Sequence, residues 1–320
     1  MKRIIACLIA AVFAGGMQSA LCQNYPVKPI RIIIPFAPGG GTDFIGRVAA
    51  QKMTEAWGQQ VIVDNRPGAG GTLGTELAIR APADGYTFAM VSSSYAVNPS
   101  LYKLTFDPIN DITAVIQLSQ GPMLLVVHPS LPVKNVRELI ALGQSKPNSL
   151  IYASSGHGGI TQLATELFND MAGIKMIHVP YKGTGPALTD TISGQAQVLF
   201  GNVATTLPQI KSGRLKGIAV STAKRIAAAP ELPTVAESGL PDYESISSYG
   251  LIAPRNLPRT VLDRVNGELN RILKLKEMSD RLAADGVSAA GGTPEEFLAL
   301  IKKDIETWRR VVQKAGIKIE

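Results

Sequence analysis

The chain has 320 residues, of which 18% are charged, and its formal net charge at pH 7 is +7. This length is enough to bury two hydrophobic cores without disulfides or metals. The basic residues are scattered and form no Lys/Arg run or patch interleaved with aromatic residues, so we expect no nucleic-acid partner. A mildly basic balance weakly favours anionic ligands.

The first 22 residues have the layout of a secretory signal peptide. Lys2 and Arg3 precede a short apolar run, and small residues follow up to Ala20. The run is too short to span a membrane. We therefore predict a signal peptide over residues 1–22, cleaved after Ala20 or Cys22, and a mature protein in the periplasm.

Both cysteines, Cys7 and Cys22, lie in or at the edge of this segment, which predicts a mature chain without a disulfide. A lipoprotein anchor at Cys22 is a weaker alternative, because Leu21 stands where a small residue is needed. Removal of Lys2 and Arg3 lowers the formal charge from +7 to +5.

A strand, a glycine-rich loop and a helix follow one another directly at the start of the mature chain. Residues 32–34 are a β-branched run typical of a buried strand, and Gly39–Gly41 form the loop. Apolar residues from Phe44 to Trp57 recur at helical spacing, with Thr42 or Asp43 as the predicted cap. The free N–H groups of such a helix start favour a carboxylate or phosphate ligand.

Two further strands of this region also end in glycine-rich or hydroxyl-rich loops. The strand at residues 60–64 runs into the loop 65–72, and the strand at residues 86–91 ends in Ser92–Ser94. Ligands bind beyond the carboxyl ends of strands in an open parallel sheet. We therefore place a ligand at this edge, although residues 68–71 also suit a plain turn and the serines a solvated strand end.

The same order of strand, polar loop and helix returns in a second series. After a strand at residues 123–129, the strand at 150–153 runs into the loop 154–161, and the loop 181–186 follows another short strand. Residues 198–200 and 217–220 are further strands. The alternation predicts an α/β fold with parallel sheets.

The order of these units predicts two lobes with a cleft between them. Crossings are expected near residues 121–128 and 247–253, and two long amphipathic helices close the chain. We assign residues 23–125 plus 250–320 to lobe 1 and residues 126–249 to lobe 2.

Catalytic and cofactor motifs are missing. The sequence contains no Gly-x-Ser-x-Gly, His-Glu-x-x-His, Cys-x-x-Cys or Walker-type motif, and Phe44 breaks the dinucleotide glycine spacing. We expect no metal and no cofactor. His128 and His178 lie beside prolines in strand runs and are interpreted as structural, whereas His157 lies in a glycine-serine loop.

Three candidate residues have two interpretations each. Asp43 either caps a helix or belongs to the ligand site, where it orders the loop or meets a ligand donor. Lys182 is either a solvated charge or a ligand anchor. His157 either faces the ligand or only the loop around it.

Several segments together resemble one family, the periplasmic receptors of tripartite tricarboxylate transporters, called TctC or Bug proteins. The resemblance covers essentially the whole mature chain and is carried by residues 25–43 (YPVKPIRIIIPFAPGGGTD), 64–72 (DNRPGAGGT), 82–87 (PADGYT), 166–168 (ELF), 179–183 (VPYKG), 233–239 (PTVAESG) and 249–251 (YGL).

This resemblance implies a two-lobed periplasmic binding protein of the Venus flytrap, type II-like architecture, which captures a small mono- or dicarboxylate for membrane permease subunits and is a monomer. It implies main-chain donors at residues 36–43 and contributions from the loops 154–161 and 181–184. The residues assigned to the ligand are Phe36, Pro38, Gly39, Gly40, Thr42, Asp43, Ser93, Ser94, Ser155, His157, Gly158, Thr161, Tyr181, Lys182, Thr184 and Asn202.

One loop departs from the family pattern. Gly159 and Gln162 stand where many relatives carry serine and histidine, and His157 stands where asparagine is common. This leaves the identity of the ligand open. The alternatives to a transport receptor are a ligand-loaded sensor subunit for a signalling kinase and an enzyme acting on an organic acid, with His157 or Lys182 as the acid–base group.

Overall fold

The computed structural model describes residues 25–284 and 286–315. The predicted signal peptide and both cysteines lie outside the described residues. None of the described helices is long and apolar enough to cross a membrane.

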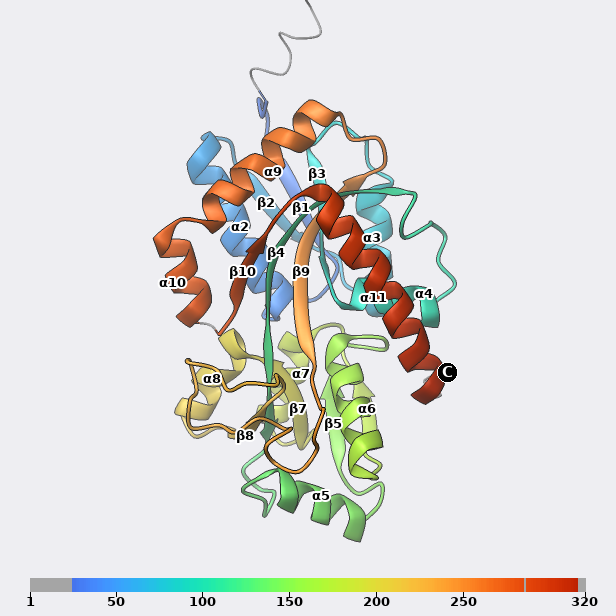
Figure 1. The fold of residues 1–320 in the computed structure, drawn as a ribbon, viewed down its shortest axis with the longest axis vertical. Coiled ribbons are helices and arrows are strands. Elements are labelled where there is room, and N and C mark those ends of the chain that lie inside the picture. The colour runs from blue at the N-terminus through green and yellow to red at the C-terminus, as the bar shows by residue number, and fades with distance from the viewer. Residues whose placement is uncertain (1–24, 285, 316–320) are drawn as a thin grey trace, which may run out of the picture.

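One curled sheet runs through the protein, and its strands form two groups with helices packed against each (Figure 1). We call the group built first along the chain the first half. Its strands are β1 (Ile30–Ile34), β2 (Val61–Asn65), β3 (Thr87–Ser92), β9 (Ile246–Pro254) and β10 (Ser288–Gly291). Its helices are α2 (Gly41–Trp57), the short η1 (Ala69–Gly71), α3 (Thr72–Ile79), α4 (Ser94–Leu101), α9 (Arg259–Leu273), α10 (Lys276–Ala284) and α11 (Pro294–Ala315).

The second half contains the middle of the chain. Its strands are β5 (Ile151–Ser154), β6 (Ile177–Pro180), β7 (Val198–Asn202) and β8 (Lys216–Val220). Its helices are α5 (Val136–Ser145), α6 (Ile160–Ala172), α7 (Thr184–Ile192) and α8 (Val203–Lys211).

The long strand β4 (Ile112–Val127) belongs to both halves. Residues 112–122 pair with β9, and residues 123–127 pair with β7. The strand order is β2-β1-β3-β9-β4-β7-β5-β6, and β8 and β10 also pair with β4. A single strand thus carries the chain from one half to the other.

The α/β class is confirmed, but the expectation of parallel sheets is only partly right. β1 pairs in parallel with β2 and β3, and β5 with β6 and β7. The strands β4, β8, β9 and β10 pair antiparallel. The apolar runs of β4, β8 and β9 look like those of the parallel strands in sequence, because a strand buried on both faces is apolar in either direction.

Five elements were absent from the sequence-based assignment: η1, α4, α8, α10 and β10. The serines expected as a strand end include Ser94, which is the first residue of α4. This helix contains Pro99, and α8 contains Pro208, so both carry a residue that argues against a helix in sequence.

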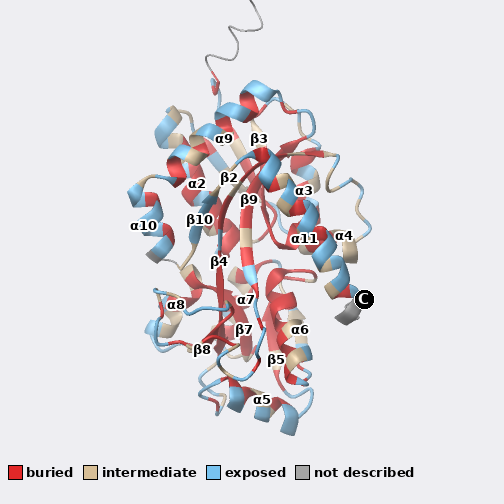
Figure 2. Cartoon of the chain, viewed as in Figure 1, coloured by how far each residue is buried: buried red, intermediate tan, exposed pale blue. Residues whose placement is uncertain are grey.

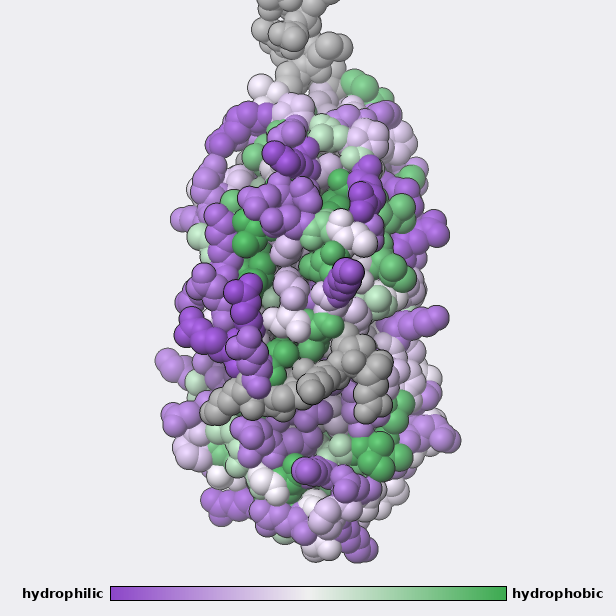
Figure 3. Space-filling model, turned by 90° about the vertical axis from the view of Figure 1, so that its right-hand side faces the viewer, coloured by the Kyte–Doolittle hydropathy of each residue, from purple (hydrophilic) through white to green (hydrophobic). Residues whose placement is uncertain are grey.

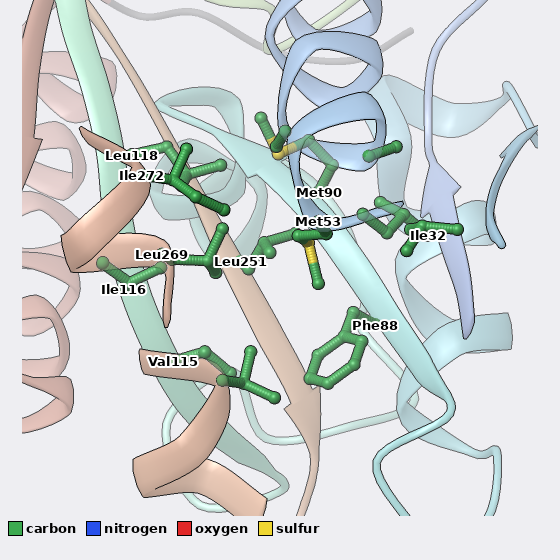
Figure 4. Packing of buried hydrophobic residues seen from close by; sticks show 14 of the residues in the cluster. Ile32, Met53, Phe88, Met90, Val115, Ile116, Leu118, Leu251, Leu269 and Ile272 are labelled. Carbon is green, nitrogen blue, oxygen red and sulfur yellow. The ribbon is translucent and has the colours of Figure 1, made fainter. Parts of the chain in front are cut away.

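Each half has its own hydrophobic core, and the buried residues follow the strands (Figure 2). In the first half, α2 and α9 cover one face of the sheet. Figure 4 shows Met53 from α2 and Leu269 from α9 packed together with Ile32, Phe88 and Leu251 from the strands. The amphipathic period of these helices directs their apolar side chains to that face.

The outer surface is mixed in character. On the face shown in Figure 3, hydrophobic residues lie scattered among hydrophilic ones. The large hydrophobic residues that are exposed come from different elements, among them Val27, Leu73 and Ile177.

Candidate ligand-binding site

Five helices begin around one small cavity between the two halves, which we call the first cavity. It contains about 310 Å³ of space free of protein atoms. Its lining residues are Phe36, Gly40, Gly41, Thr42, Ser92, Ser94, Ser155, Ile160, Thr184, Asn202 and Tyr249. None of these residues carries a formal charge at neutral pH.

The helix starts come from both halves. α2 begins at Gly41 and α4 at Ser94, whereas α6 begins at Ile160, α7 at Thr184 and α8 directly after Asn202. In none of the five does the N-cap side chain accept a hydrogen bond from the helix. Each directs backbone N–H groups and the positive end of a dipole at the cavity, although the first N–H of α2 is taken by Asn202 and that of α6 by Ser94. The cavity therefore suits an anion.

The start of α2 corrects one expectation. The N-cap is Gly40, in an extended conformation, and not Thr42 or Asp43. A Cβ at Gly40 would lie in ordinary contact, 3.4 Å from the Cβ of Thr184, whereas a Cβ at Gly41 would clash with the Tyr249 hydroxyl and the Asn202 amide. The glycine loop therefore brings backbone, with no side chain between, against the other half.

Asp43 orders the glycine loop. Its carboxylate accepts hydrogen bonds from the Gly39 N–H at 3.0 Å, from the Arg47 guanidinium at 3.0 Å and from the Asn65 amide at 2.9 Å. Burial alone would raise the pKa of this carboxyl, but the three donors outweigh it and hold the pKa below its usual range. The loop therefore rests on an ionised Asp43.

Asn202 joins the two halves at the cavity wall. Its side-chain oxygen accepts the Gly41 N–H at 3.0 Å, and its amide nitrogen contacts the Tyr249 hydroxyl. Burial raises the pKa of Tyr249 to about 12, against the lowering effect of its hydrogen bonds with Ser247 and Asn202. Tyr249 is therefore a neutral phenol that faces the cavity.

A second contact between the halves joins the loop after β1 to the loop after β6. The Ala37 N–H donates to the Lys182 carbonyl at 2.8 Å. Gly185 packs so closely on the Pro38 carbonyl that a Cβ would clash with it. Both loops are thus held by backbone contacts, which any side chain at Gly185 would disrupt.

A larger cavity adjoins the first one, and Phe36 and Ser155 line both. This second cavity contains about 440 Å³ of space free of protein atoms. Unlike the first cavity, it has a histidine and a lysine in its wall. Its other lining residues are Gly68, Ala69, Gly70, Gly71, Tyr102, Gly156, His157, Pro180, Tyr181 and Lys182.

A buried hydrogen-bond network supports the wall that both cavities share. Gln162 accepts the Gly158 N–H through its side-chain oxygen at 2.7 Å, so its amide nitrogen is the group that faces His178 Nδ1 at 3.2 Å. His178 then carries its proton on Nε2 and donates it to the Ser154 hydroxyl at 2.6 Å.

Burial, and to a smaller extent the nearby His157, together lower the pKa of His178 to about 4. The ring of His178 stacks on Tyr152 and meets the His157 ring edge-on, with centroids 5.1 Å apart. His178 supports the loop between β5 and α6 as a neutral imidazole. This agrees with its interpretation as structural.

The structure divides the sequence-predicted site residues into three groups. The first cavity is lined by Phe36, Gly40, Thr42, Ser94, Ser155, Thr184 and Asn202, and the second by Phe36, Ser155, His157, Tyr181 and Lys182. The residues that line neither cavity are Pro38, Gly39, Asp43, Ser93, Gly158 and Thr161.

Residues of the third group support the wall. Ser93 accepts the Ser248 N–H at 2.8 Å, and the Thr161 hydroxyl accepts the Ser155 N–H at 2.7 Å. Gly158 lies beneath Leu101, whose Cδ1 atom would be 2.9 Å from a Cβ at that position.

The sequence-based assignment missed several lining residues, above all Tyr249, Ile160 and Tyr102. Tyr249 lies on a strand, and nothing in the sequence indicates which face its ring occupies. Tyr102 directly follows helix α4, and predicting this helix from the sequence would have placed Tyr102 near the site. Residues 68–71 line the second cavity although a plain turn seemed the better interpretation.

No group of three or more His, Asp or Glu side chains that could hold a metal ion occurs within residues 25–284 and 286–315. The polar groups that line the two cavities are backbone amides, the hydroxyls of Ser, Thr and Tyr side chains, the Asn202 amide, His157 and Lys182.

Comparisons with known proteins point to one family. The family model described as tripartite tricarboxylate transporter family receptor matches residues 45–317. The chain is 32% identical to protein BugT of Bordetella pertussis over 324 residues, which cover 100% of this chain and 99% of that protein.

Solved structures agree. An R. palustris protein in complex with adipate is 34% identical with a TM-score of 0.90, and the match covers 92% of this chain and 100% of that one. MatC from Rhodopseudomonas palustris with bound malate is 29% identical with a TM-score of 0.85, covering 90% and 100%. The periplasmic binding protein BugD is 31% identical with a TM-score of 0.89, covering 92% and 100%. The chain therefore belongs to the TctC family of receptors of tripartite tricarboxylate transporters.

Proposed function

We propose that this protein is a periplasmic receptor that captures a small organic acid between its two halves and delivers it to the permease subunits of a tripartite transporter. The observation that carries the proposal is the convergence of five uncapped helix starts on a cavity whose wall has no charged side chain. Backbone donors of this kind stabilise a carboxylate. The related structures with adipate and malate support the same ligand class.

We propose residues 23–125 plus 250–320 as one lobe and residues 126–249 as the other; these bounds fall within the strands β4 and β9. Both cavities have walls from both lobes, so a bound acid would be enclosed only when the lobes come together. Closure would then be driven by contacts that the acid makes to both sides at once.

The second cavity is the proposed place for the other end of the ligand. Lys182 and His157 line it, and Phe36 and Ser155 connect it to the first cavity. A dicarboxylate would place one carboxylate among the helix starts and the other near Lys182, whereas a monocarboxylate would use the helix starts alone.

Calorimetry with matched solutes tests the proposal. Adipate should bind stoichiometrically and be recovered unchanged, and hexanoate should bind more weakly. Adipamide, which has the same chain and no charge, should not bind. Binding of adipamide as tight as that of adipate would contradict the anion site, and conversion of the solute would establish an enzyme.

Lys182→Met tests the assignment of the second cavity. It should weaken adipate binding while leaving hexanoate binding unchanged, because only adipate has a second carboxylate. Lys211→Met in the exposed last turn of α8 is the matched control. An equal loss for both solutes would contradict the placement of the second carboxylate. Co-purification with membrane permease subunits, and not with a kinase, would separate transport from signalling.

A further inference from the structure

An apolar contact beside the cavities joins the two halves through Val97 and Leu101, which line neither cavity. Val97 of α4 is fully buried, and it packs in the hydrophobic cluster of the second half together with Ile160 and Leu163 of α6. Leu101, one turn further along α4, packs against the same cluster. Tyr95 and Ala96, which directly precede Val97 on α4, belong instead to the core of the first half.

The two faces of α4 thus serve different halves. Leu101 rests on Gly158, where φ is +72° and a Cβ would lie 2.9 Å from the leucine Cδ1 atom. Such an approach requires glycine at position 158. The α4 helix therefore docks on the start of α6 with the close packing of a protein interior.

Two hydrogen bonds border this apolar contact. The Ile160 N–H donates to the Ser94 hydroxyl at 3.1 Å, and the Tyr102 hydroxyl donates to the His157 carbonyl at 2.9 Å. Both cross from one half to the other. The contact is therefore a complete small interface with an apolar centre and a polar border.

Helix α11 packs against α4. It packs along α4 and reaches α6, as Figure 1 shows on the right of the molecule. Its residue Trp308 packs against the cores of both halves, and Val312 belongs to the core of the second. Helix α11 thus packs on α4 and on the core of the second half at once.

We propose that the contact of Val97 and Leu101 with α6 determines how tightly the receptor binds its solute, although neither residue lines a cavity. The contact exists only when the halves lie together, so its free energy stabilises the enclosing arrangement. Apparent affinity is the intrinsic affinity reduced by the fraction of molecules that are competent to bind. Changes at α4 should therefore alter affinity for all solutes by one factor and leave selectivity unchanged.

This inference rests on the proposed function for its effect on affinity, but the contact itself can be tested without a solute. Hydrogen exchange in the full mature chain reports on two amides that donate across the halves, Ala37 to Lys182 and Ile160 to Ser94. The first joins the loop after β1 to the loop after β6, and the second joins α6 to α4. Only a motion of the whole halves exposes both.

Val97→Ala should speed exchange at both amides by about tenfold, the effect of about two buried methyl groups. The matched control is Val136→Ala, which removes the same atoms from a fully buried site on α5 in the same cluster. It should lower the stability of the fold without changing exchange at Ala37. Unchanged exchange at Ala37 in Val97→Ala, or faster exchange at Ile160 alone, would overturn the proposal.

Affinity is then measured with adipate and malate as probes. Val97→Ala and Leu101→Ala should weaken both by the same factor, whereas Ser155→Ala in the cavity wall should change their ratio. A changed ratio in Val97→Ala would overturn the proposal. If neither probe binds the wild-type chain, the proposed ligand class fails, and the exchange result alone decides whether the α4 contact holds the halves together.

Discussion

The side-chain oxygen of Asn202 accepts a hydrogen bond from the Gly41 N–H across the cavity, at 3.0 Å. Gly41 is the first residue of α2 in the first half, and Asn202 ends β7 in the second. The first N–H group of α2, which points at the ligand site, thus donates to a residue of the opposite half. The same atoms position the site and hold the halves together.

Asn202→Ala should weaken solute binding by roughly twofold to tenfold, because the net contribution of one hydrogen bond is about 0.5–1.5 kcal/mol. The Gly41 N–H would then have to find another acceptor. Calorimetry with adipate provides the measurement, and Lys211→Ala on the exposed end of α8 is the control. An affinity equal to that of the wild type would show that this hydrogen bond does not contribute to closure.

Gly41→Ala should weaken binding more strongly, by about tenfold or more. A Cβ at this position would clash with the Tyr249 hydroxyl and the Asn202 amide, and overpacking costs roughly 1–3 kcal/mol. The fold itself should remain stable, because alanine is favoured over glycine in a helix.

The control is Gly267→Ala in α9, where nothing lies within 4 Å of the added Cβ. This variant should be as stable as the wild type or more so and should bind normally. Thermal unfolding and calorimetry on both variants separate the effects. Normal binding by Gly41→Ala would contradict the tight approach of the halves.

The buried neutral His178 predicts a pH-dependent stability. Its pKa is about 4 in the folded protein, below the value of about 6.5 for an unperturbed imidazole. The unfolded chain therefore binds the proton first as the pH falls. Stability contributed by the neutral ring is complete above about pH 6.5 and is lost progressively as the pH falls toward 4.

His178→Gln should remove this part of the pH dependence, measured as the free energy of unfolding in urea between pH 4 and 7. His128→Gln is the matched control, since the His128 ring contacts Ser130 and lies outside both cavities. A slope that persists unchanged in His178→Gln would refute the assigned role of the neutral imidazole.

Asp43→Asn should lower the free energy of unfolding at pH 7 by about 1.5–3 kcal/mol, because the carboxylate accepts charge-assisted hydrogen bonds. The pKa of Asp43 is lowered in the folded state, so its contribution is present above the unfolded value of about 3.9. It is lost as the pH falls through the lower folded pKa. The difference between variant and wild type should therefore shrink in acid.

The control for this comparison is Asp263→Asn, which breaks an exposed ion pair with Arg259. Surface pairs contribute about 0–1 kcal/mol. Equal destabilisation by both variants would mean that Asp43 has no special role in the glycine loop.

The sequence by itself determined the α/β class, the family and the loops that meet at the site. Strand runs such as residues 32–34 and the glycines 39–41 are local signals, because β-branched residues and conformational freedom act within a few residues. The departures from the family pattern at His157 and Gln162 were also visible in the sequence. In the structure, His157 lines the second cavity and Gln162 accepts the N–H of Gly158 in the same loop.

The tertiary structure decided which residues of those loops face the cavities and which support them. Thr161 and Gly158 lie in a glycine-serine loop that seemed uniformly suited to a ligand, but one holds Ser155 and the other receives Leu101. Tyr249 lies on a strand whose sequence carries no ligand signal, and Ser94 was expected at a strand end but begins helix α4. Such roles depend on contacts between residues that are distant in the chain, and only the packing of the two halves determines them.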